Sequence, residues 1–228
     1  MAPPRQEHPI PHRPVVLVHG TRTSSAIWRP QAAALRAHGH PVVAVDLPGH
    51  GTRHDERFTL EGALATIDDA VRSCDRPPLL VGLSLGGYAS LAYARQHGDD
   101  VAGVMLAGCC TEIKGKPLGL YRRAAARVTS WLNIGGAGWH VVTDMLAALT
   151  GYSPLADLRR LTMPVWFVNG QHDPLRLDEW RYRRAAPNAR MTVVPHAGHD
   201  VNTHQPAAFT GHLLDFLTEL RQPVVPAA

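Results

Sequence analysis

Six short runs of β-branched and aliphatic residues alternate along this chain with longer stretches that have helical spacing. The runs are Val15–Val18, Val42–Val45, Leu79–Val81, Val101–Leu106, Val165–Val168 and Met191–Val194. The helical stretches are chiefly Ile27–Ala37, Leu60–Ser73, Gly87–Gln96, Leu177–Ala186 and Pro206–Leu220. Short, continuously apolar strands are typical of parallel sheets whose two faces are both covered. The alternation therefore predicts βαβ units and an α/β fold on a mostly parallel sheet of about six strands flanked by helices.

Length and composition indicate one ordinary globular domain. The chain has 228 residues, of which 45% are hydrophobic and 18% charged, and this is enough to bury a sizeable core. We expect a single domain over residues 14–228, preceded by a flexible tail over residues 1–13 that is rich in proline and histidine. Because no apolar run is long enough to cross a membrane and the tail lacks the apolar core of a secretory signal, we expect no membrane partner and a cytoplasmic location.

Charge and cysteine content indicate which partners and which compartment to expect. The formal net charge is +4 at pH 7, but the basic residues are scattered, which favours a solvated basic surface over nucleic-acid binding. Of the three cysteines, Cys109 and Cys110 are adjacent and Cys74 stands alone. This arrangement is no disulfide framework, and it suits a reducing compartment.

One long segment interrupts the alternation. Residues 111–162 contain an amphipathic stretch over 118–132, a glycine-rich joint over 135–138 and a second apolar stretch over 141–149, but no strand pattern. Segments of this length inside a compact domain are usually functional. We therefore expect residues 111–162 to form a small helical lid, inserted between the fourth and fifth strands, over the end of the sheet. A helical hairpin packed on one flank is the alternative.

A serine on a tight turn is the first feature that points to chemistry. Ser84 lies in the sequence Gly-Leu-Ser-Leu-Gly over residues 82–86, between the third strand and a helical stretch. Glycines at both ends allow the strand and the helix to approach closely, and the turn holds the serine hydroxyl out from the end of the sheet. Such a serine is a nucleophile only if a base takes its proton and an acid orients that base.

The exits of the last two strands supply these partners. Asp173 follows the fifth strand, and His199 follows the sixth. Reactive groups in open α/β sheets collect at the carboxyl ends of strands, so Ser84, Asp173 and His199 are expected to meet there. No metal site is expected.

Each partner has an alternative in the sequence. His196 lies three residues before His199, and Asp173 could merely cap the next helix. Glu112 follows the fourth strand and is the alternative acid, and Asp46, after the second strand, is a weaker one.

Together, these motifs resemble the α/β-hydrolase superfamily from about Val15 to Leu220. The blocks that carry the resemblance are residues 19–21, 46–51 and 82–86 and the loops that hold Asp173 and His199. The order serine, acid, histidine is that of the superfamily. The resemblance implies the sheet order second, first, third, fourth, fifth, sixth, with a trimmed amino terminus. It also implies an oxyanion hole formed by the backbone N–H groups of Thr21 and Leu85 and no cofactor.

The sequence thus predicts a serine hydrolase that cleaves a carboxylic ester, thioester or lactone of a small, moderately apolar molecule through an acyl-enzyme on Ser84. Trp28, Tyr121 and Trp131 are the candidate substrate contacts, although Trp28 could equally pack in the core. A cyclase or acyltransferase that uses the same acyl-enzyme is the runner-up. Haloperoxidase and carbon-carbon bond hydrolase activities, and a binding protein without catalysis, are further alternatives.

Overall fold

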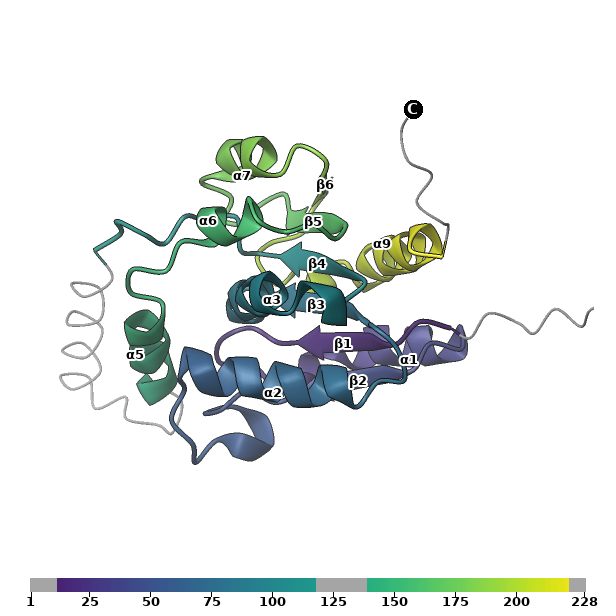
Figure 1. Cartoon of the computed structure of the whole chain (residues 1–228), viewed down its shortest axis with the longest axis horizontal. Helices are drawn as coiled ribbons and strands as arrows, with labels where there is room; N and C mark the ends of the chain where they lie inside the picture. Colours follow the sequence, from purple (N-terminus) through teal and green to yellow (C-terminus); the bar gives the residue numbers. More distant parts are fainter. Residues whose placement is uncertain (1–11, 118–138, 222–228) are drawn as a thin grey trace, which may run out of the picture.

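The structure, a computed structural model, describes residues 12–117 and 139–221. Its centre is a six-stranded sheet with the order β2-β1-β3-β4-β5-β6, and every neighbouring pair of strands is parallel. The strands are β1 (Val15–Val18), β2 (Val42–Val45), β3 (Leu79–Leu83), β4 (Gly103–Ala107), β5 (Val165–Gly170) and β6 (Arg190–Val194). The predicted fold class and the predicted strand order are both confirmed (Figure 1).

Helices connect the strands and cover both faces of the sheet. The α-helices are α1 (Arg29–Ala37), α2 (Leu60–Arg72), α3 (Leu85–Gln96), α5 (Trp139–Ala148), α6 (Pro154–Leu158), α7 (Glu179–Ala185), α8 (Val201–His204) and α9 (Pro206–Glu219). Short 3-10 helices are η1 (Ser25–Trp28), η2 (Gly51–Arg53) and η3 (Gly98–Asp100). Arg13, the last residue of the predicted tail, donates hydrogen bonds to Pro77 O and Leu220 O. Residues 1–11 of the predicted tail lie outside the described residues.

The pleat of the strands divides the core into two layers. Val15 and Leu17 pack on one face with residues of α1 and α9, whereas Val16 and Val18 pack on the other face with residues of α2 and α3. Successive side chains of a strand point to opposite faces, so a strand that is apolar throughout fills both layers. All four residues of β1 are fully buried, as this pattern requires.

Strands β3, β5 and β6 are each one or two residues longer than predicted, and β4 begins later than predicted for a reason that the register makes clear. The apolar run was expected to form a strand from Val101, but β4 begins at Gly103. Leu79, the first residue of β3, pairs with Gly103, and Val101 directly follows η3. The pairing of β4 with β3 therefore starts at Gly103, opposite the first residue of β3.

The segment between β4 and β5 contains α5 and α6. Helix α6 packs against α3 and α7, on the flank of the sheet. Helix α5 lies beyond the carboxyl ends of the strands (Figure 1), where Met145 Sδ accepts a hydrogen bond of 2.9 Å from Thr21 Oγ1. The predicted amphipathic stretch over residues 118–132 and the glycine-rich joint lie outside the described residues, as do Tyr121 and Trp131.

No helix in the described ranges is long and apolar enough to cross a membrane.

Trp28 is a core residue and not a wall of an active-site pocket. Its side chain is fully buried, and its ring lies 5.8 Å from the ring of Phe209 on α9. A ring enclosed in this way offers no surface to a substrate. Of the two interpretations of Trp28, helix packing is the one that the structure supports.

Replacing Trp28 with alanine is expected to lower the free energy of unfolding by about 3–5 kcal/mol, because the large ring leaves a cavity that the core fills only in part. Urea denaturation followed by circular dichroism measures the change. Trp180→Ala is the control, because Trp180 is 66% exposed and its loss is expected to change the unfolding free energy by less than about 0.5 kcal/mol. Equal effects of the two substitutions would contradict the core assignment.

Candidate active site

Ser84 lies on a strained turn between β3 and α3. Its backbone has φ 53° and ψ −115°, in the region that residues other than glycine rarely adopt. A Cβ on Gly86 would collide with the backbone oxygens of Val18 and His19 at the end of β1. The absence of a side chain at Gly86 therefore brings the first turn of α3 against the end of β1, with Ser84 at the head of the helix.

Asp173 and His199 form a hydrogen-bonded pair at the exits of β5 and β6. His199 Nδ1 lies 2.9 Å from Asp173 Oδ1, and the Asp173 side chain is fully buried while that of His199 is 31% exposed. Because a carboxylate only accepts hydrogen bonds, Nδ1 carries the proton and Nε2 is left as a proton acceptor. The pair has the geometry of an acid that orients a base.

Asp173 makes one further contact within its own loop. Its Oδ1 also accepts the backbone N–H of Leu175 at 2.8 Å, which is an Asx-type contact two residues along the chain. Helix α7 begins only at Glu179, so Asp173 is not the cap of that helix. Its other oxygen, Oδ2, is buried and accepts no hydrogen bond from the described residues.

The environment of His199 raises its pKa above the ordinary value for histidine. Burial alone would lower this pKa, but the hydrogen bond and the negative charge of Asp173, with a smaller contribution from Asp200, outweigh it. A raised pKa strengthens the imidazole as a base and keeps it protonated to a higher pH.

Ser84 and His199 both border the turn that follows β4. The Ser84 N–H donates to Ala107 O at 2.7 Å. The next residue, Gly108, has φ 62°, and a Cβ there would lie 2.9 Å from His199 Cε1. In the described part of the chain no hydrogen bond joins Ser84 Oγ to the His199 imidazole. Hydrogen bonds between a nucleophile and its base often form at full strength only when a substrate is bound.

The loop after β1 lies beside Ser84 and is held by a neutral histidine. A Cβ on Gly20 would lie 3.3 Å from Ser84 Cβ. His19 is fully buried, with Nδ1 2.8 Å from Gly20 O and Nε2 accepting the Leu47 N–H at 3.1 Å. Burial lowers the pKa of His19 to about 4, although the Gly20 contact opposes the shift. His19 is thus a neutral support for the loop.

This loop brings Thr21 to the same corner as the start of α3. Thr21 follows Gly20 directly, and Leu85 is the first residue of α3, whose N–H group is not used within the helix. The positive end of the helix dipole also points there. The arrangement places the two predicted oxyanion donors at the ends of neighbouring segments around Ser84.

The carboxylate of Glu112, the alternative acid, is hydrogen-bonded to the start of α6 and not to His199. Its buried carboxylate accepts the N–H of Lys114 at 3.1 Å and the N–H of Leu155, in the first turn of α6, at 3.2 Å. The carboxylate that meets His199 is that of Asp173. Glu112 is therefore a structural acceptor that joins the exit of β4 to α6.

The other two alternatives also lie away from this pair. Asp46 accepts hydrogen bonds from Ser25 and Thr52; burial raises the pKa of its carboxyl group, but these bonds outweigh burial and lower it to about 2. His196 is exposed, and its N–H donates to Gln171 Oε1 at 3.0 Å. Asp46 connects two loops, and His196 lies on the surface.

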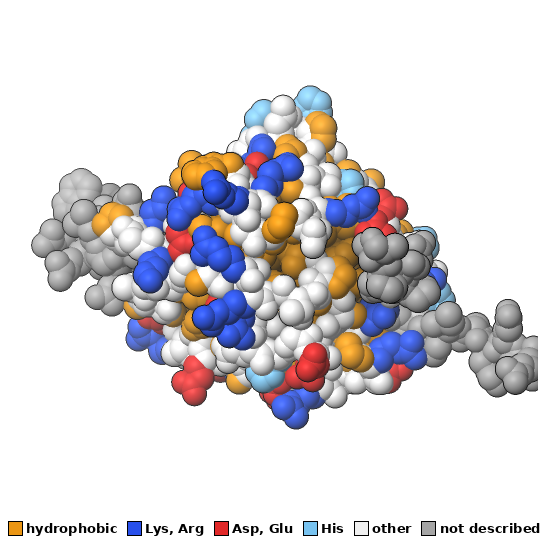
Figure 2. All heavy atoms as spheres, turned by 45° about the horizontal axis from the view of Figure 1, so that its top comes forward, with side chains coloured by type: hydrophobic (Ala, Val, Ile, Leu, Met, Phe, Trp, Pro, Cys, Tyr) orange, Lys and Arg blue, Asp and Glu red, His pale blue; other side chains and the backbone are white. Residues whose placement is uncertain are grey.

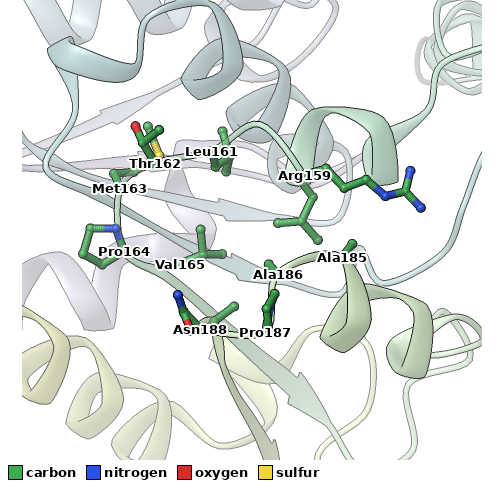
Figure 3. A pocket seen from close by; sticks show the side chains of 12 residues that line it. Arg159, Leu161, Thr162, Met163, Pro164, Val165, Ala185, Ala186, Pro187 and Asn188 are labelled. Carbon is green, nitrogen blue, oxygen red and sulfur yellow. The ribbon is translucent and has the colours of Figure 1, made fainter. Parts of the chain in front are cut away.

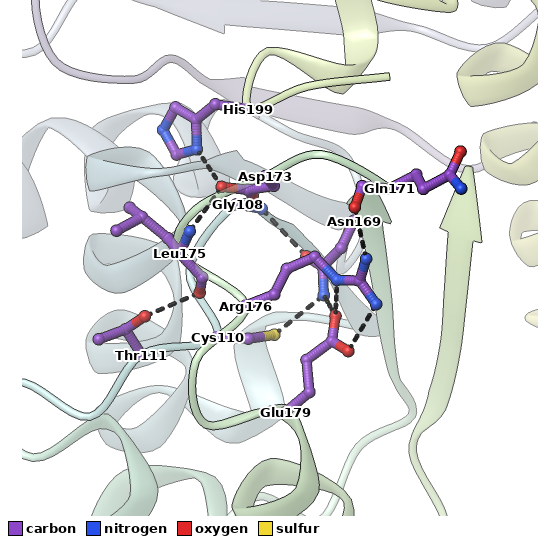
Figure 4. Close-up of polar contacts among 10 residues, drawn as sticks. All are labelled: Gly108, Cys110, Thr111, Asn169, Gln171, Asp173, Leu175, Arg176, Glu179 and His199. Atoms are coloured by element: carbon purple, nitrogen blue, oxygen red, sulfur yellow. Dashed lines mark hydrogen bonds and ion pairs between the residues drawn. The ribbon is translucent and has the colours of Figure 1, made fainter. Parts of the chain in front are cut away.

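A buried amide supports the site in a way that the sequence did not reveal. Asn169 is fully buried on β5. Its Oδ1 accepts the Gly108 N–H at 3.2 Å, and its Nδ2 donates to Cys110 Sγ at 3.2 Å and to Glu179 Oε1 at 2.8 Å (Figure 4). Asn169 thus joins the turn behind His199 to the first residue of α7.

The same network closes the loop that carries Asp173. Glu179 forms a two-bond ion pair with Arg176, at 2.7 and 2.9 Å, and Arg176 donates to Gln171 O at 2.9 Å. Figure 4 shows these contacts beside Asp173 and His199. Both ends of the loop over residues 171–179 are therefore connected to β5 and α7 by charged or buried hydrogen bonds.

Replacing Asn169 with leucine is expected to lower the free energy of unfolding by about 1–3 kcal/mol, because the Gly108 N–H is left buried without an acceptor. Chemical denaturation measures the loss, and hydrogen exchange by NMR is expected to show faster exchange of the Gly108 amide. Asn188→Leu is the matched control, because Asn188 is exposed. Unchanged stability and unchanged exchange at Gly108 would contradict this role of Asn169.

Known proteins resemble this chain in sequence and in overall fold. A family model described as the alpha/beta hydrolase family matches residues 15–211. A Variovorax paradoxus protein named as a carbamate hydrolase is 27% identical over 256 residues, which cover 93% of this chain and 94% of that protein. A pimeloyl-acyl-carrier-protein methyl ester esterase of Neisseria meningitidis is 27% identical over 252 residues, covering 93% and 96% respectively. The solved structure of a thermophilic esterase from Thermogutta terrifontis is similar, with a TM-score of 0.76, 24% identity and coverage of 92% and 91%. The chain belongs to the α/β-hydrolase family.

Proposed function

We propose that this protein is a serine hydrolase that cleaves a carboxylic ester, thioester or lactone of a small, moderately apolar molecule. The observation that carries the proposal is the hydrogen bond between His199 and the buried Asp173, next to the turn that also holds Ser84. Relatives of this chain are named for cleavage of a carbamate and of a methyl ester. Both names support chemistry at a carbonyl with an oxygen or nitrogen leaving group.

The reaction begins when His199 Nε2 takes the Ser84 proton as the oxygen attacks the substrate carbonyl. Asp173 holds the imidazole in the required tautomer and stabilises the imidazolium that forms. The backbone N–H groups of Thr21 and Leu85 receive the developing oxyanion, and each such donor typically contributes about 3–4 kcal/mol. His199 then returns the proton to the leaving alcohol or thiol, and a water molecule repeats the cycle on the acyl-enzyme.

The surroundings of the loop after β1 favour an apolar acyl group. Met145 of α5 contacts Thr21, and Val141 of the same helix is buried near the loop that contains Gly49. An apolar wall beside a few directed polar groups is the usual composition of a small-molecule site. Transfer of the acyl group to a nucleophile other than water, as in a cyclase or acyltransferase, would use the same acyl-enzyme.

Ser84→Ala is expected to reduce cleavage of p-nitrophenyl butyrate and of a butyryl thioester by a factor of about 10⁴ or more, because the nucleophile is lost. A fluorophosphonate probe is expected to label Ser84 in the unchanged protein and to leave the variant unlabelled. Circular dichroism of the variant checks that the fold is kept. Full turnover by the variant would sink the proposal, and a failure of the probe to label Ser84 would favour a binding protein.

The pH dependence of the rate provides a separate test. Asp173 raises the pKa of His199, so the neutral, reactive imidazole is lost as the pH falls through that raised value. Asp173→Asn is expected to lower the rate by about 10⁴ and to move the acid limb of the remaining rate to lower pH. Glu112→Gln is the matched control and is expected to leave the position of the limb unchanged. A limb that moves with Glu112→Gln, and not with Asp173→Asn, would identify Glu112 as the acid.

A further inference from the structure

A cavity of about 500 Å³ lies at the end of the sheet opposite to Ser84. Its walls are the loop that leads into β5, over residues 161–165, and the loop that leads into β6, over residues 185–189 (Figure 3). Asp173 and His199 follow the other ends of these two strands. A strand of six residues spans about 17 Å, so the cavity is separate from the site of the proposed hydrolysis.

Most of the side chains that line this cavity are apolar, but Arg159, Thr162 and Asn188 also line it, and almost half of its exposed surface is polar. Leu158, Met163, Pro164, Val165 and Ala186 all line it. The volume falls within the range of about 300–1,000 Å³ that is usual for small-molecule sites. Such a hollow accepts a short hydrocarbon chain or a ring.

A second hollow, of about 350 Å³, adjoins the first and is strongly basic. Arg159 and Ala185 line both hollows, and Trp180, Arg181 and Arg184 complete the second one. Figure 3 shows the Arg159 guanidinium extending away from the other labelled residues. Figure 2, in which the top of Figure 1 comes forward, shows Lys and Arg side chains gathered beside hydrophobic ones on this face.

The charges of this second hollow are largely uncompensated. Among the residues that the structure describes, no Asp or Glu lines it. Arg181 pairs with Asp178 at 3.2 Å, whereas neither Arg159 nor Arg184 forms an ion pair with any of the described residues. Arginine binds carboxylate and phosphate with two parallel hydrogen bonds. The 66% exposed indole of Trp180 adds a flat apolar surface beside these cations.

The geometry points to a second ligand site, for an amphipathic carboxylate whose apolar part occupies the cavity between the two loops and whose anionic group contacts Arg159 and Arg184. The two hollows together match such a molecule, since apolar side chains predominate in the first and arginines in the second. A neutral apolar molecule would leave the arginines without a partner, and a small inorganic anion would leave the first hollow empty. This assignment does not depend on the proposed hydrolysis, although cleavage of an apolar ester would release an acid of this class.

Octanoate is the probe, and isothermal titration calorimetry measures its binding to the Ser84→Ala protein. We expect octanoate to bind at least tenfold more tightly than 1-octanol, acetate or inorganic phosphate. The same octanoate binding is expected in wild-type protein whose Ser84 has first been blocked with a fluorophosphonate. Loss of binding on blocking would place octanoate in the active site and overturn the proposal, as would equal affinity for octanol or for acetate.

Two kinds of variant locate the site. Arg159→Gln combined with Arg184→Gln is expected to weaken octanoate binding at least tenfold, and Ala186→Phe is expected to weaken it by filling the cavity. Arg183→Gln is the matched control, because Arg183 is an exposed arginine of α7 that lines neither hollow. Octanoate binding that is equal in the double variant and in the control overturns the proposal, whether or not Ala186→Phe folds.

Discussion

The contact between the first turn of α3 and the end of β1 is the constraint on which the candidate active site depends. It exists because Gly86 has no side chain where the oxygens of Val18 and His19 approach. From it follow the strained backbone of Ser84, the exposure of the helix N–H groups at the same point and the position of the loop that contains Thr21. The packing contact between β1 and α3 thus positions Ser84, the first N–H groups of α3 and the loop that contains Thr21.

The negative charge of Asp173 favours His199 as the base of the candidate site. Oδ1 of the buried Asp173 contacts His199 and also accepts the N–H of Leu175. The carboxylates of Glu112 and Asp46 accept backbone N–H groups elsewhere. In a low-dielectric interior a carboxylate acts most strongly on the partner that it touches. What distinguishes Asp173 as the proposed acid is therefore its contact with His199, because all three carboxylates accept backbone N–H groups.

The sequence was sufficient for the fold because apolar runs of strand length mark buried parallel strands wherever they occur. It was also sufficient to propose Ser84, Asp173 and His199, since each follows a strand and strand exits share one edge of the sheet. It could not place Trp28, because an aromatic residue after β1 is compatible with either a pocket or a core, and the deciding neighbour, Phe209, is distant in the chain.

The role of Asn169 cannot be predicted from the sequence for a related reason. In the sequence it only ends an apolar run, and its partners Gly108, Cys110 and Glu179 come from three separate segments. Glu112 illustrates the converse. Its place after β4 was correctly identified as a strand exit, but the direction of its carboxylate is set by the N–H groups of α6, and helix boundaries in that segment have no clear sequence pattern.

The pKa values of the two histidines near Ser84, His19 and His199, are shifted in opposite directions. His19 is so deeply buried that its pKa falls to about 4, whereas the pKa of His199 is raised. His19 therefore stays neutral over the range in which His199 gains or loses its proton. Of these two side chains, only that of His199 is therefore expected to change its charge as the pH passes through its raised pKa.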